Sequence, residues 1–317
     1  MTLISVRDLV VDFRTSTGQV GAVRSVSFDL APGERIALVG ESGCGKTTTM
    51  LAMMGLLPES ATVSGQVILD GVDILAGGES SMRPHRWNDV AMVFQGAMNA
   101  LNPVRKIGNQ VVEAVRIHGG TKRAGRERTR ELFDLVGLGP ELIDRYPHEI
   151  SGGQRQRAVI ALALACRPRV LLADEPTTAL DVIVQEQIVA LLKRLSETLG
   201  LAVVLVTHDL ALVPQLCDRA AVMYAGSIVE DASCAELVNS PAHPYTRRLV
   251  EATPDLEGRR SLVSIPGVPP RLDRPLVGCP FQPRCGEAVD RCADDAPQLL
   301  QIGAARTCAC HLTEELV

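Results

Sequence analysis

The sequence GESGCGKT occupies residues 40–47 and fits the pattern G-x-x-x-x-G-K-[ST] of a phosphate-binding loop. An apolar run at 36–39 precedes the loop and a helical pattern begins near Lys46, which is the strand–loop–helix context that this pattern requires. The glycines let backbone N–H groups surround phosphate oxygens, and the start of the helix adds a favourable partial charge. The stretch predicts a nucleotide site on a sheet of the α/β class.

The polar residues of this loop have predicted roles. We expect Lys46 to reach the β- and γ-phosphates of ATP and the Thr47 hydroxyl to bind Mg²⁺. Cys44 stands in a variable position of the pattern, where a small residue fits. The residues predicted to bind the nucleotide are Gly40, Ser42, Gly43, Cys44, Gly45, Lys46, Thr47 and Thr48.

A second segment, RVLLADEP at residues 169–176, ends an apolar run with two carboxylates. Sheets of this type bind ligands at the edge where their strands end, so we expect Asp174 to hold Mg²⁺. Glu175 is placed to orient or deprotonate the attacking water. By itself such a pair is also typical of an exposed strand end, but together with the phosphate loop it predicts a nucleoside triphosphatase.

The residues before about 165 predict strands first and helices later. Strand-like runs cover 3–13, 23–30 and 35–39, and Asp70-Gly71 after an apolar run predicts a hairpin turn. Helical spacing follows from about 97 to 165. This half therefore predicts a β-rich part followed by a helical insertion.

The remaining residues return to alternation and then lose it. Apolar runs at 170–173 and 201–206 flank a helical stretch at 182–199, which implies a parallel sheet flanked by helices. After about residue 235 prolines are frequent, so long regular elements are not expected there. We expect a small, loop-rich extension at 236–317.

Composition excludes several classes of protein. Hydrophobic residues make up 46% of the 317 residues and charged residues 22%, which is ordinary for a globular chain. The net charge of −5 argues against nucleic acid as the main partner. The longest apolar candidate, 158–166, falls short of the roughly 18–20 residues that span a bilayer. The first residues lack the pattern of a secretory signal, so we expect a cytosolic protein that reaches a membrane only by association.

The segment ISGGQRQR at residues 150–157 narrows the choice among nucleotide hydrolases. Here the chain resembles the ABC transporter ATPases, whose signature is usually LSGGQ, with Ile150 in place of the leucine. A serine hydroxyl and small glycines at a helix N-terminus would form a second anion-binding device. The resemblance implies that this device completes the nucleotide site of the opposite subunit in a head-to-tail dimer, through Ser151, Gly152, Gly153 and Gln154.

Four further residues match family elements in the expected order. Gln95 matches the glutamine that senses the γ-phosphate and Mg²⁺ and contacts the permease, and His208 matches the switch histidine that contacts the γ-phosphate. Asp181 matches the D-loop at the dimer interface, and Phe13 matches the aromatic residue that stacks on adenine, where tyrosine is commoner. The implied catalytic residues are Lys46, Gln95, Glu175 and His208, and the implied Mg²⁺ ligands are Thr47, Gln95 and Asp174.

The resemblance also implies a fold and a domain order. The expected fold is that of a P-loop NTPase, with a RecA-like core, a β-subdomain, a helical signature subdomain at about 97–165 and the small extension. The ATPase domain is expected at 1–235 and the extension at 236–317.

The extension is similar to that of one group of importers. The segments HPYT at 243–246, SIPGVP at 264–269 and GCPFQPRC at 278–285 resemble the C-terminal extension of oligopeptide, dipeptide and nickel importer ATPases. The loop QGAMNALNP at 95–103 is similar to the same group. The resemblance implies an engine for the import of di- and oligopeptides; the alternative is nickel or another small solute.

The resemblance implies partners and a location. The partners are a second ATPase subunit, expected to be a paralogue in a heterodimer, two transmembrane permeases and an extracytoplasmic solute-binding protein. The chain would lie on the cytoplasmic face of the inner membrane as a peripheral protein, and no nucleic acid partner is expected. Two other classes stay open: a non-transport ATPase of this family that acts on nucleic acid or the ribosome, and a binding module with an inactive site.

Cysteines crowd the end of the chain. Five of the nine lie between 279 and 310, and in a reducing compartment such a cluster favours metal binding over disulfides. Four thiolates suffice for a [4Fe–4S] cluster or, as the alternative, tetrahedral Zn²⁺, whose usual short spacing is absent. Cys308 could replace Cys310, but the family pattern ends in Cys-His, as Cys310-His311 does. The predicted cluster ligands are Cys279, Cys285, Cys292 and Cys310; buried, reduced cysteines or a disulfide pair are the remaining alternatives.

Overall fold

The computed structural model describes residues 2–16, 18–96, 100–253 and 264–316 and divides into two compact units. Residues 97–99, in the loop that resembles the peptide importers, therefore lie outside the described residues. The first unit comprises Met1–Ala31, Arg35–Glu79 and Val206–Val317, and the second comprises Pro32–Glu34 and Ser80–Leu205. Residues 236–317, which the sequence predicts as an extension, belong to the first unit.

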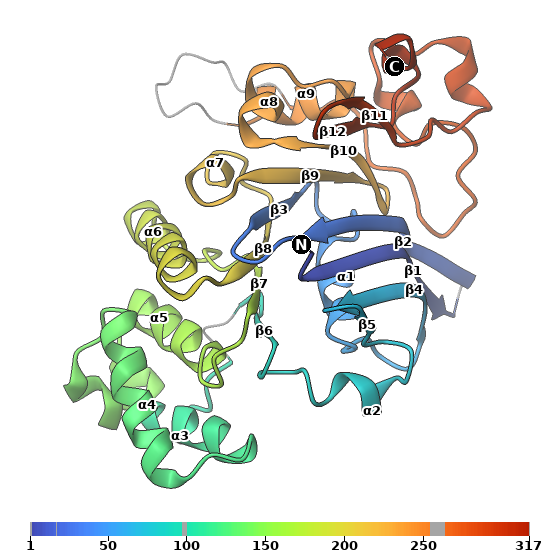
Figure 1. The fold of residues 1–317 in the computed structure, drawn as a ribbon. Helices are drawn as coiled ribbons and strands as arrows, with labels where there is room; N and C mark the ends of the chain where they lie inside the picture. The colour runs from blue at the N-terminus through green and yellow to red at the C-terminus, as the bar shows by residue number, and fades with distance from the viewer. Residues whose placement is uncertain (1, 17, 97–99, 254–263, 317) are drawn as a thin grey trace. The chain divides into compact units, whose positions relative to one another are not determined.

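The first unit contains an antiparallel sheet in the order β2-β1-β4-β5. Figure 1 shows these strands side by side near the N-terminus. Asp70 and Gly71, with φ of 48° and 84°, join the last two strands, so the predicted hairpin turn is confirmed. The strands are β1 (Ile4–Thr15), β2 (Gly18–Leu30), β4 (Ala61–Leu69) and β5 (Val72–Asp73).

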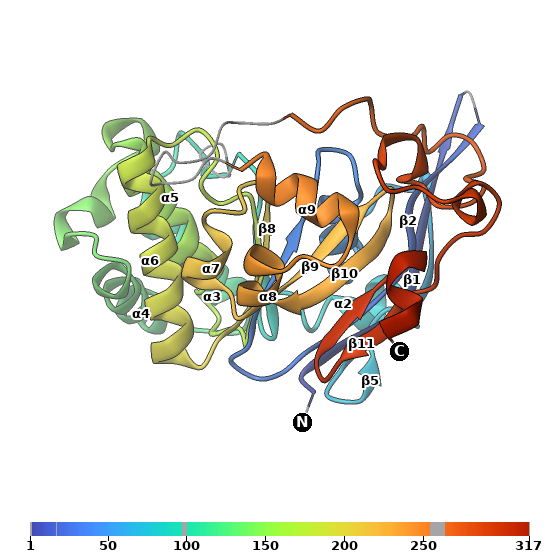
Figure 2. The same cartoon turned by 90° about the horizontal axis from the view of Figure 1, so that it is seen from above.

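A second group of strands in this unit follows the order β11-β12-β10-β9-β3. The pairing of β3 with β9 is parallel and the others are antiparallel, which makes the sheet mixed. Helix α8 packs on β9 and β10, and α9 packs on α8 (Figure 2). The elements are β3 (Arg35–Val39), α1 (Lys46–Met53), α7 (Val213–Leu216), β9 (Arg219–Tyr224), β10 (Ser227–Ser233), α8 (Cys234–Asn239), α9 (Pro244–Glu251), β11 (Leu300–Gly303) and β12 (Arg306–Cys308).

The second unit combines parallel strands with a helical part. Strands β6 and β7 pair in parallel, and β7 and β8 are buried along their whole length, as apolar runs without alternation predict. The predicted helix at 182–199 is confirmed with the same bounds. Asp181 caps its start, and Gly200 takes a left-handed φ of 64° at its end, which explains where the helix begins and ends. The elements are β6 (Val90–Val93), α3 (Ile107–Ile117), α4 (Lys122–Leu135), α5 (Gly152–Ala163), β7 (Val170–Asp174), α6 (Val182–Leu199) and β8 (Ala202–Thr207). The boundary with the first unit falls within β8, after Leu205.

The helical spacing predicted from about 97 to 165 is confirmed by α3, α4 and α5. None of the helices in the described ranges has the length and apolar character that crossing a membrane requires. The short helices are α2 (Glu79–Met82), η2 (Pro140–Asp144), η3 (Pro147–Glu149), η4 (Gln282–Arg284), η5 (Asp290–Ala293) and η6 (His311–Leu316).

A buried polar cluster joins the C-terminal strands of the first unit to α9. Glu230 of β10 is fully buried and pairs with Arg306 of β12 over 2.7 Å. The same carboxylate accepts the backbone N–H groups of Ala242 and His243, each over 2.9 Å. His243 in turn accepts the N–H of Tyr245 with its Nδ1 over 3.0 Å and thereby caps α9. Burial lowers the pKa of His243 to about 4, because the charged imidazolium would lose its hydration.

We expect acid to destabilise the first unit through His243. The folded pKa of about 4 lies below the unfolded value of 6.5, so the unfolded chain binds the proton first as pH falls. Above the unfolded pKa, His243 does not lower the free energy of unfolding. Between about pH 6.5 and 4 the free energy of unfolding falls, by on the order of 3 kcal/mol in all. Unfolding by urea at several pH values measures this slope.

Two variants test the assignment of this slope. His243→Asn can keep an acceptor for the Tyr245 N–H but carries no proton in this range, so its slope between pH 7 and 5 should be smaller. His148→Gln alters an exposed imidazole and serves as the control. An unchanged slope in His243→Asn would assign the acid sensitivity to other groups.

Candidate functional site

The phosphate loop needs glycine at two positions for steric reasons. Gly40 has a φ of 151°, and a Cβ there would lie 2.2 Å from the Met223 carbonyl oxygen. Gly45 has a φ of 104°, and a Cβ there would lie 2.4 Å from the carbonyl oxygen of Ala22. Both contacts are with backbone atoms of neighbouring strands or turns, so a side chain could not be accommodated by a rotamer change. The loop is thus pressed against the sheet of its own unit.

Lys46 begins α1 and points back into the loop. The residue is 6% exposed, and Nζ donates to the carbonyl oxygens of Gly40 and Glu41 over 2.7 and 2.9 Å. Gly45, the N-cap residue of α1, has no side chain that could approach the first N–H groups of the helix. A buried ammonium group at a glycine-rich helix N-terminus is an arrangement that binds phosphate.

The other predicted residues of the loop lie around this ammonium group. Cys44 is buried, and burial raises the pKa of its thiol, so it is a neutral lining residue. Ser42 and Gly43 are exposed at the tip of the loop, and Thr47 and Thr48 are half-buried in the first turn of α1.

The carboxylate of Glu41, within the same loop, has partners that the sequence did not predict. Arg284 donates Nη1 and Nη2 to its two carboxylate oxygens over 2.6 and 2.9 Å. The Glu41 N–H donates to the hydroxyl of Tyr245 over 2.9 Å. These contacts join residues 243 and 204 positions apart, which no local pattern can reveal.

Phe13 and His208 also belong to the first unit. Phe13 is half-buried on β1, and His208 is exposed directly after β8. The backbone turns sharply after His208, because Asp209 N–H donates to the Thr207 hydroxyl over 3.0 Å and Ala211 N–H to the Asp209 carboxylate over 2.9 Å. The structure thus places the histidine at the end of a buried strand, as the sequence predicts.

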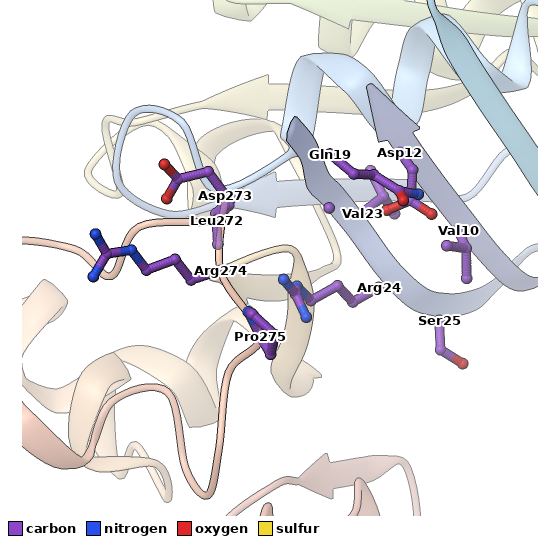
Figure 3. A pocket seen from close by; sticks show the side chains of 11 residues that line it. Val10, Asp12, Gln19, Val23, Arg24, Ser25, Leu272, Asp273, Arg274 and Pro275 are labelled. Atoms are coloured by element: carbon purple, nitrogen blue, oxygen red, sulfur yellow. The ribbon is translucent and has the colours of Figure 1, made fainter. Parts of the chain in front are cut away.

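A groove of about 670 Å³ lies beside the β1–β2 hairpin (Figure 3). One wall comes from the hairpin and carries Asp12 and Arg24, and the other comes from residues 272–275. Asp12 and Phe13 are successive strand residues and point to opposite faces, so the groove is separate from the predicted adenine-stacking ring. Its charges are mixed in sign, which does not suit a triphosphate.

In the second unit the parallel pairing of β6 and β7 brings two predicted residues together. Val93 pairs with Ala173, and Gln95 and Glu175 each follow two positions later. The Gln95 side-chain amide donates to the Glu175 carboxylate over 2.9 Å. Asp174, the last residue of β7, is 1% exposed. The acidic strand end and the predicted glutamine therefore form one polar group.

The backbone of Glu175 is unusual. Its φ of 45° lies in the left-handed region, which a residue with a long side chain rarely adopts. The Thr178 hydroxyl donates to the same carboxylate over 2.9 Å and helps to hold it. Such conformations persist where the surrounding structure enforces them and are concentrated at functional sites.

The signature residues form the start of α5. Ser151 caps the helix by accepting the Gln154 N–H over 3.2 Å, and the Gln154 side chain accepts the Ser151 N–H over 2.9 Å. This capping box is a local role for both residues that the S-x-x-Q spacing itself could have revealed. Gly153 approaches α6 so closely that a Cβ would lie 2.9 Å from a Val184 methyl group.

The predicted D-loop lies at the start of α6. Asp181 accepts the Val184 N–H over 3.0 Å and caps the helix, and Ala179 has a left-handed φ of 66°. The predicted nucleotide residues thus divide between the units. The first unit holds Phe13, residues 40–48 and His208, and the second holds Gln95, residues 151–154, Asp174, Glu175 and Asp181.

The C-terminal cysteines are free thiols that influence one another. Burial raises the pKa of Cys310 to about 11, and its neighbours Cys279, Cys285 and Cys292 add to the rise. The Cys279 N–H donates to the Cys292 carbonyl over 2.8 Å. Yet across the described residues no three His, Cys, Asp or Glu side chains converge to hold a metal ion. The predicted metal site therefore gains no support from the placement of the side chains.

Comparison with protein families finds two matches. Residues 23–178 match the family described as "ABC transporter". Residues 229–292 match the family described as "Oligopeptide/dipeptide transporter, C-terminal region". The first match includes residues 40–48, Gln95, residues 151–154, Asp174 and Glu175, but not Phe13, Asp181 or His208. The second covers most of the predicted extension.

Individual relatives agree with these matches. The chain is 47% identical to a "Probable peptide ABC transporter ATP-binding protein" (y4tR) of Sinorhizobium fredii, over 99% of this chain and 96% of the relative. It is 45% identical to an oligopeptide transport ATP-binding protein, OppD, of Mycobacterium bovis, over 98% of this chain but 52% of that longer relative. The solved structure of the dimeric bacterial ABC transporter cassette MJ0796 is 28% identical, with a TM-score of 0.65 over 73% of this chain and 98% of that one.

Proposed function

Because the chain belongs to the ABC transporter family, we propose that it binds and hydrolyses MgATP to drive the import of peptides across a membrane. The observation that carries the proposal is the buried Lys46 at the start of α1, whose ammonium group points back into the glycine loop. The peptide class is supported by the match of residues 229–292 and by the relatives at 47% and 45% identity.

Each residue has a proposed role in hydrolysis. Lys46 and the N–H groups of the loop hold the β- and γ-phosphates, and Thr47 and Asp174 bind Mg²⁺. Glu175 activates the attacking water, and Gln95 holds the Glu175 carboxylate by the 2.9 Å hydrogen bond. His208 contacts the γ-phosphate, and Phe13 stacks on adenine. The phosphates of ATP carry the negative charge that the loop would bind, and Mg²⁺ carries the positive charge that the acidic strand end would bind.

A second subunit completes the proposed site. The N-terminus of α5, with its signature residues 151–154, would bind the γ-phosphate held by the partner's phosphate loop, in a head-to-tail dimer. We propose a paralogous ATPase as this partner, and the dimeric structure of the similar cassette MJ0796 supports a second ATPase subunit. Two permeases and an extracytoplasmic solute-binding protein complete the assembly, with this chain peripheral on the cytoplasmic face.

Reconstitution of the assembly tests this function. The chain with its partner ATPase and permeases, in proteoliposomes supplied with peptide-loaded binding protein, should hydrolyse ATP roughly tenfold or more faster than alone, since closure of the dimer completes the site. Labelled di- or oligopeptide should accumulate only with ATP. Accumulation of nickel in place of peptide would assign the alternative solute, and ATP-dependent binding of RNA or ribosomes would assign the non-transport class.

We propose further that Cys279, Cys285, Cys292 and Cys310 hold a [4Fe–4S] cluster that stabilises the extension. The choice of these residues is supported by the pKa of Cys310, which Cys279, Cys285 and Cys292 all raise, since only neighbouring groups act in this way. The short spacing that is usual for zinc ligands is absent from these cysteines, which favours the cluster over zinc. Bound iron would hold these thiols as thiolates.

Anaerobic purification tests the cluster. The protein should be brown and contain about four irons per chain. Cys310→Ser should lower the iron content, whereas Cys308→Ser should retain it, and Cys217→Ser on a distant buried thiol is the control. One zinc per chain would replace the cluster by the alternative metal, and a metal-free, stable protein would exclude both.

A further inference from the structure

The phosphate loop contains a negative charge of its own. Glu41 is its second residue, directly after Gly40 and close to Lys46, whose Nζ donates to the Glu41 carbonyl over 2.9 Å. The phosphates of ATP would bring several further negative charges to the same loop. Like charges at short range oppose one another, most strongly where little water lies between them. An acidic residue at this position therefore needs a counter-ion.

Arg284 meets Glu41 in the geometry of a counter-ion. Its two terminal nitrogens reach the two carboxylate oxygens over 2.6 and 2.9 Å, which is the bidentate arrangement that gives the strongest ion pairs. The Arg284 side chain is 4% exposed and the Glu41 side chain 25% exposed. Salt screens such a pair much less than one on the surface. The pair thus compensates the negative charge that Glu41 brings to the loop.

Contacts on the other sides of the guanidinium keep it in place. Nε donates to the Pro266 carbonyl over 2.8 Å, and Nη1 also donates to the Tyr224 hydroxyl over 3.3 Å. The rings of Tyr224 and Phe281 lie 5.8 and 6.0 Å from the guanidinium carbon. Aromatic faces attract a cation at this range. These hydrogen bonds and ring contacts hold the Arg284 guanidinium in place beside the Glu41 carboxylate.

The neighbouring residues pack closely around the same loop. Tyr245 accepts the Glu41 N–H, and its ring lies 4.6 Å from that of Tyr224. The hollow between the loop and residues 269–272 measures about 20 Å³, which is room for a single water molecule. The C-terminal segment is therefore packed directly against the phosphate loop of the same unit.

We propose that Arg284 is the counter-ion of the phosphate loop and that it makes this acidic loop able to bind MgATP. The proposal rests on the proposed function of residues 40–47 as the ATP-binding loop. Arg284 acts through Glu41 and is a positioning residue. Its effect should appear in the affinity for nucleotide, because an uncompensated carboxylate repels the phosphates already in the bound ground state.

Equilibrium binding of MgATP to the full chain tests the proposal through a rescue. Arg284→Met keeps most of the side-chain volume but removes the charge, and should weaken binding roughly tenfold or more. Glu41→Gln in the same chain removes the uncompensated carboxylate, and should bring the affinity back to within about threefold of the wild type. Arg284→Lys keeps the charge without the fork and should bind almost normally. A residue that only supported the fold would show no such rescue.

Two control variants separate this effect from other causes. Arg306→Met removes another buried pair of the same unit, whose guanidinium bonds Glu230 and the Ser240 carbonyl, and should bind MgATP as the wild type does. Lys46→Ala tests the loop itself, and normal binding by that variant would refute the proposed function and not only the role of Arg284.

Three results would overturn the proposal. These are normal affinity in Arg284→Met, equal loss in Arg284→Met and Arg306→Met, and a double variant as weak as Arg284→Met. If Arg284→Met does not fold, Arg284→Gln with and without Glu41→Gln repeats the comparison. Weaker binding by the single variant and recovery in the double variant support the proposal, and equal affinities contradict it.

Discussion

Replacement of Lys46 by alanine is expected to reduce ATP hydrolysis by roughly a hundredfold or more, because the developing charge on the phosphates loses its positioned cation. Lys46 is 6% exposed and its ammonium group is bonded to two carbonyl groups of its loop. Residues 40–47 contain no other cationic side chain that could replace it. Release of inorganic phosphate by the chain with its partner subunits measures the rate.

Circular dichroism and thermal unfolding must accompany this measurement, since the same lysine ties the loop together. Lys193→Ala changes an exposed lysine of α6 and should leave the rate unaffected. Hydrolysis within tenfold of the wild type in a folded Lys46→Ala variant would refute the assignment of residues 40–47.

Replacement of Glu175 by glutamine is expected to lower the turnover of ATP by about 10²–10⁴-fold while binding persists, because an amide cannot take a proton from the attacking water. Glutamine keeps the size of the side chain and can still accept hydrogen bonds from Gln95 and Thr178. Since ATP then stays bound between the subunits, gel filtration with MgATP should show a stable dimer. Single-turnover kinetics measures the chemical step.

The exposed Glu141 of the second unit offers the matched control, and Glu141→Gln should hydrolyse ATP normally. Near-normal turnover by Glu175→Gln would mean that another group activates the water. Loss of ATP binding, in contrast, would assign the charge of Glu175 to nucleotide binding and away from proton transfer.

The parts of the fold that sequence predicts well are those with local signals. The helix at 182–199 has a capping aspartate before it and a glycine after it, and its observed bounds agree with the prediction. The hairpin turn at Asp70-Gly71 has residues that tolerate positive φ. The loop at 40–47 could be predicted as a unit, because its glycines, lysine and threonine serve one steric and electrostatic purpose.

The strands that sequence analysis missed have no such signal. Strands β9 and β10, between 219 and 233, contain several alanines and are almost entirely buried, so neither β-propensity nor alternation marks them. The short β11 and β12 pair at the edge of β10, in a stretch where prolines led us to expect loops. Burial on both faces removed the pattern on which the prediction depends.

The residues of the site also differ in whether a local signal in the sequence predicts their contacts. The contact between Gln95 and Glu175 follows from two parallel strand ends and could be anticipated once those strands were recognised. The pairing of Glu41 with Arg284 could not, because both residues look like ordinary surface charges in the sequence and they are 243 positions apart. Long-range ion pairs depend on tertiary packing and leave no periodic trace.

The division of the first unit between both ends of the chain affects how the protein folds during its synthesis. The ribosome completes residues 80–205 as one continuous stretch, which can fold as it emerges. The first unit must wait, because β9, which pairs with β3, and Arg284 are made only after that stretch. Strand β3 and the phosphate loop are therefore exposed without partners during most of translation. The newly made N-terminal segment therefore presents unpaired strand edges over this period, and a chain that stops before residue 284 lacks the partner that the Glu41 carboxylate has in the complete protein.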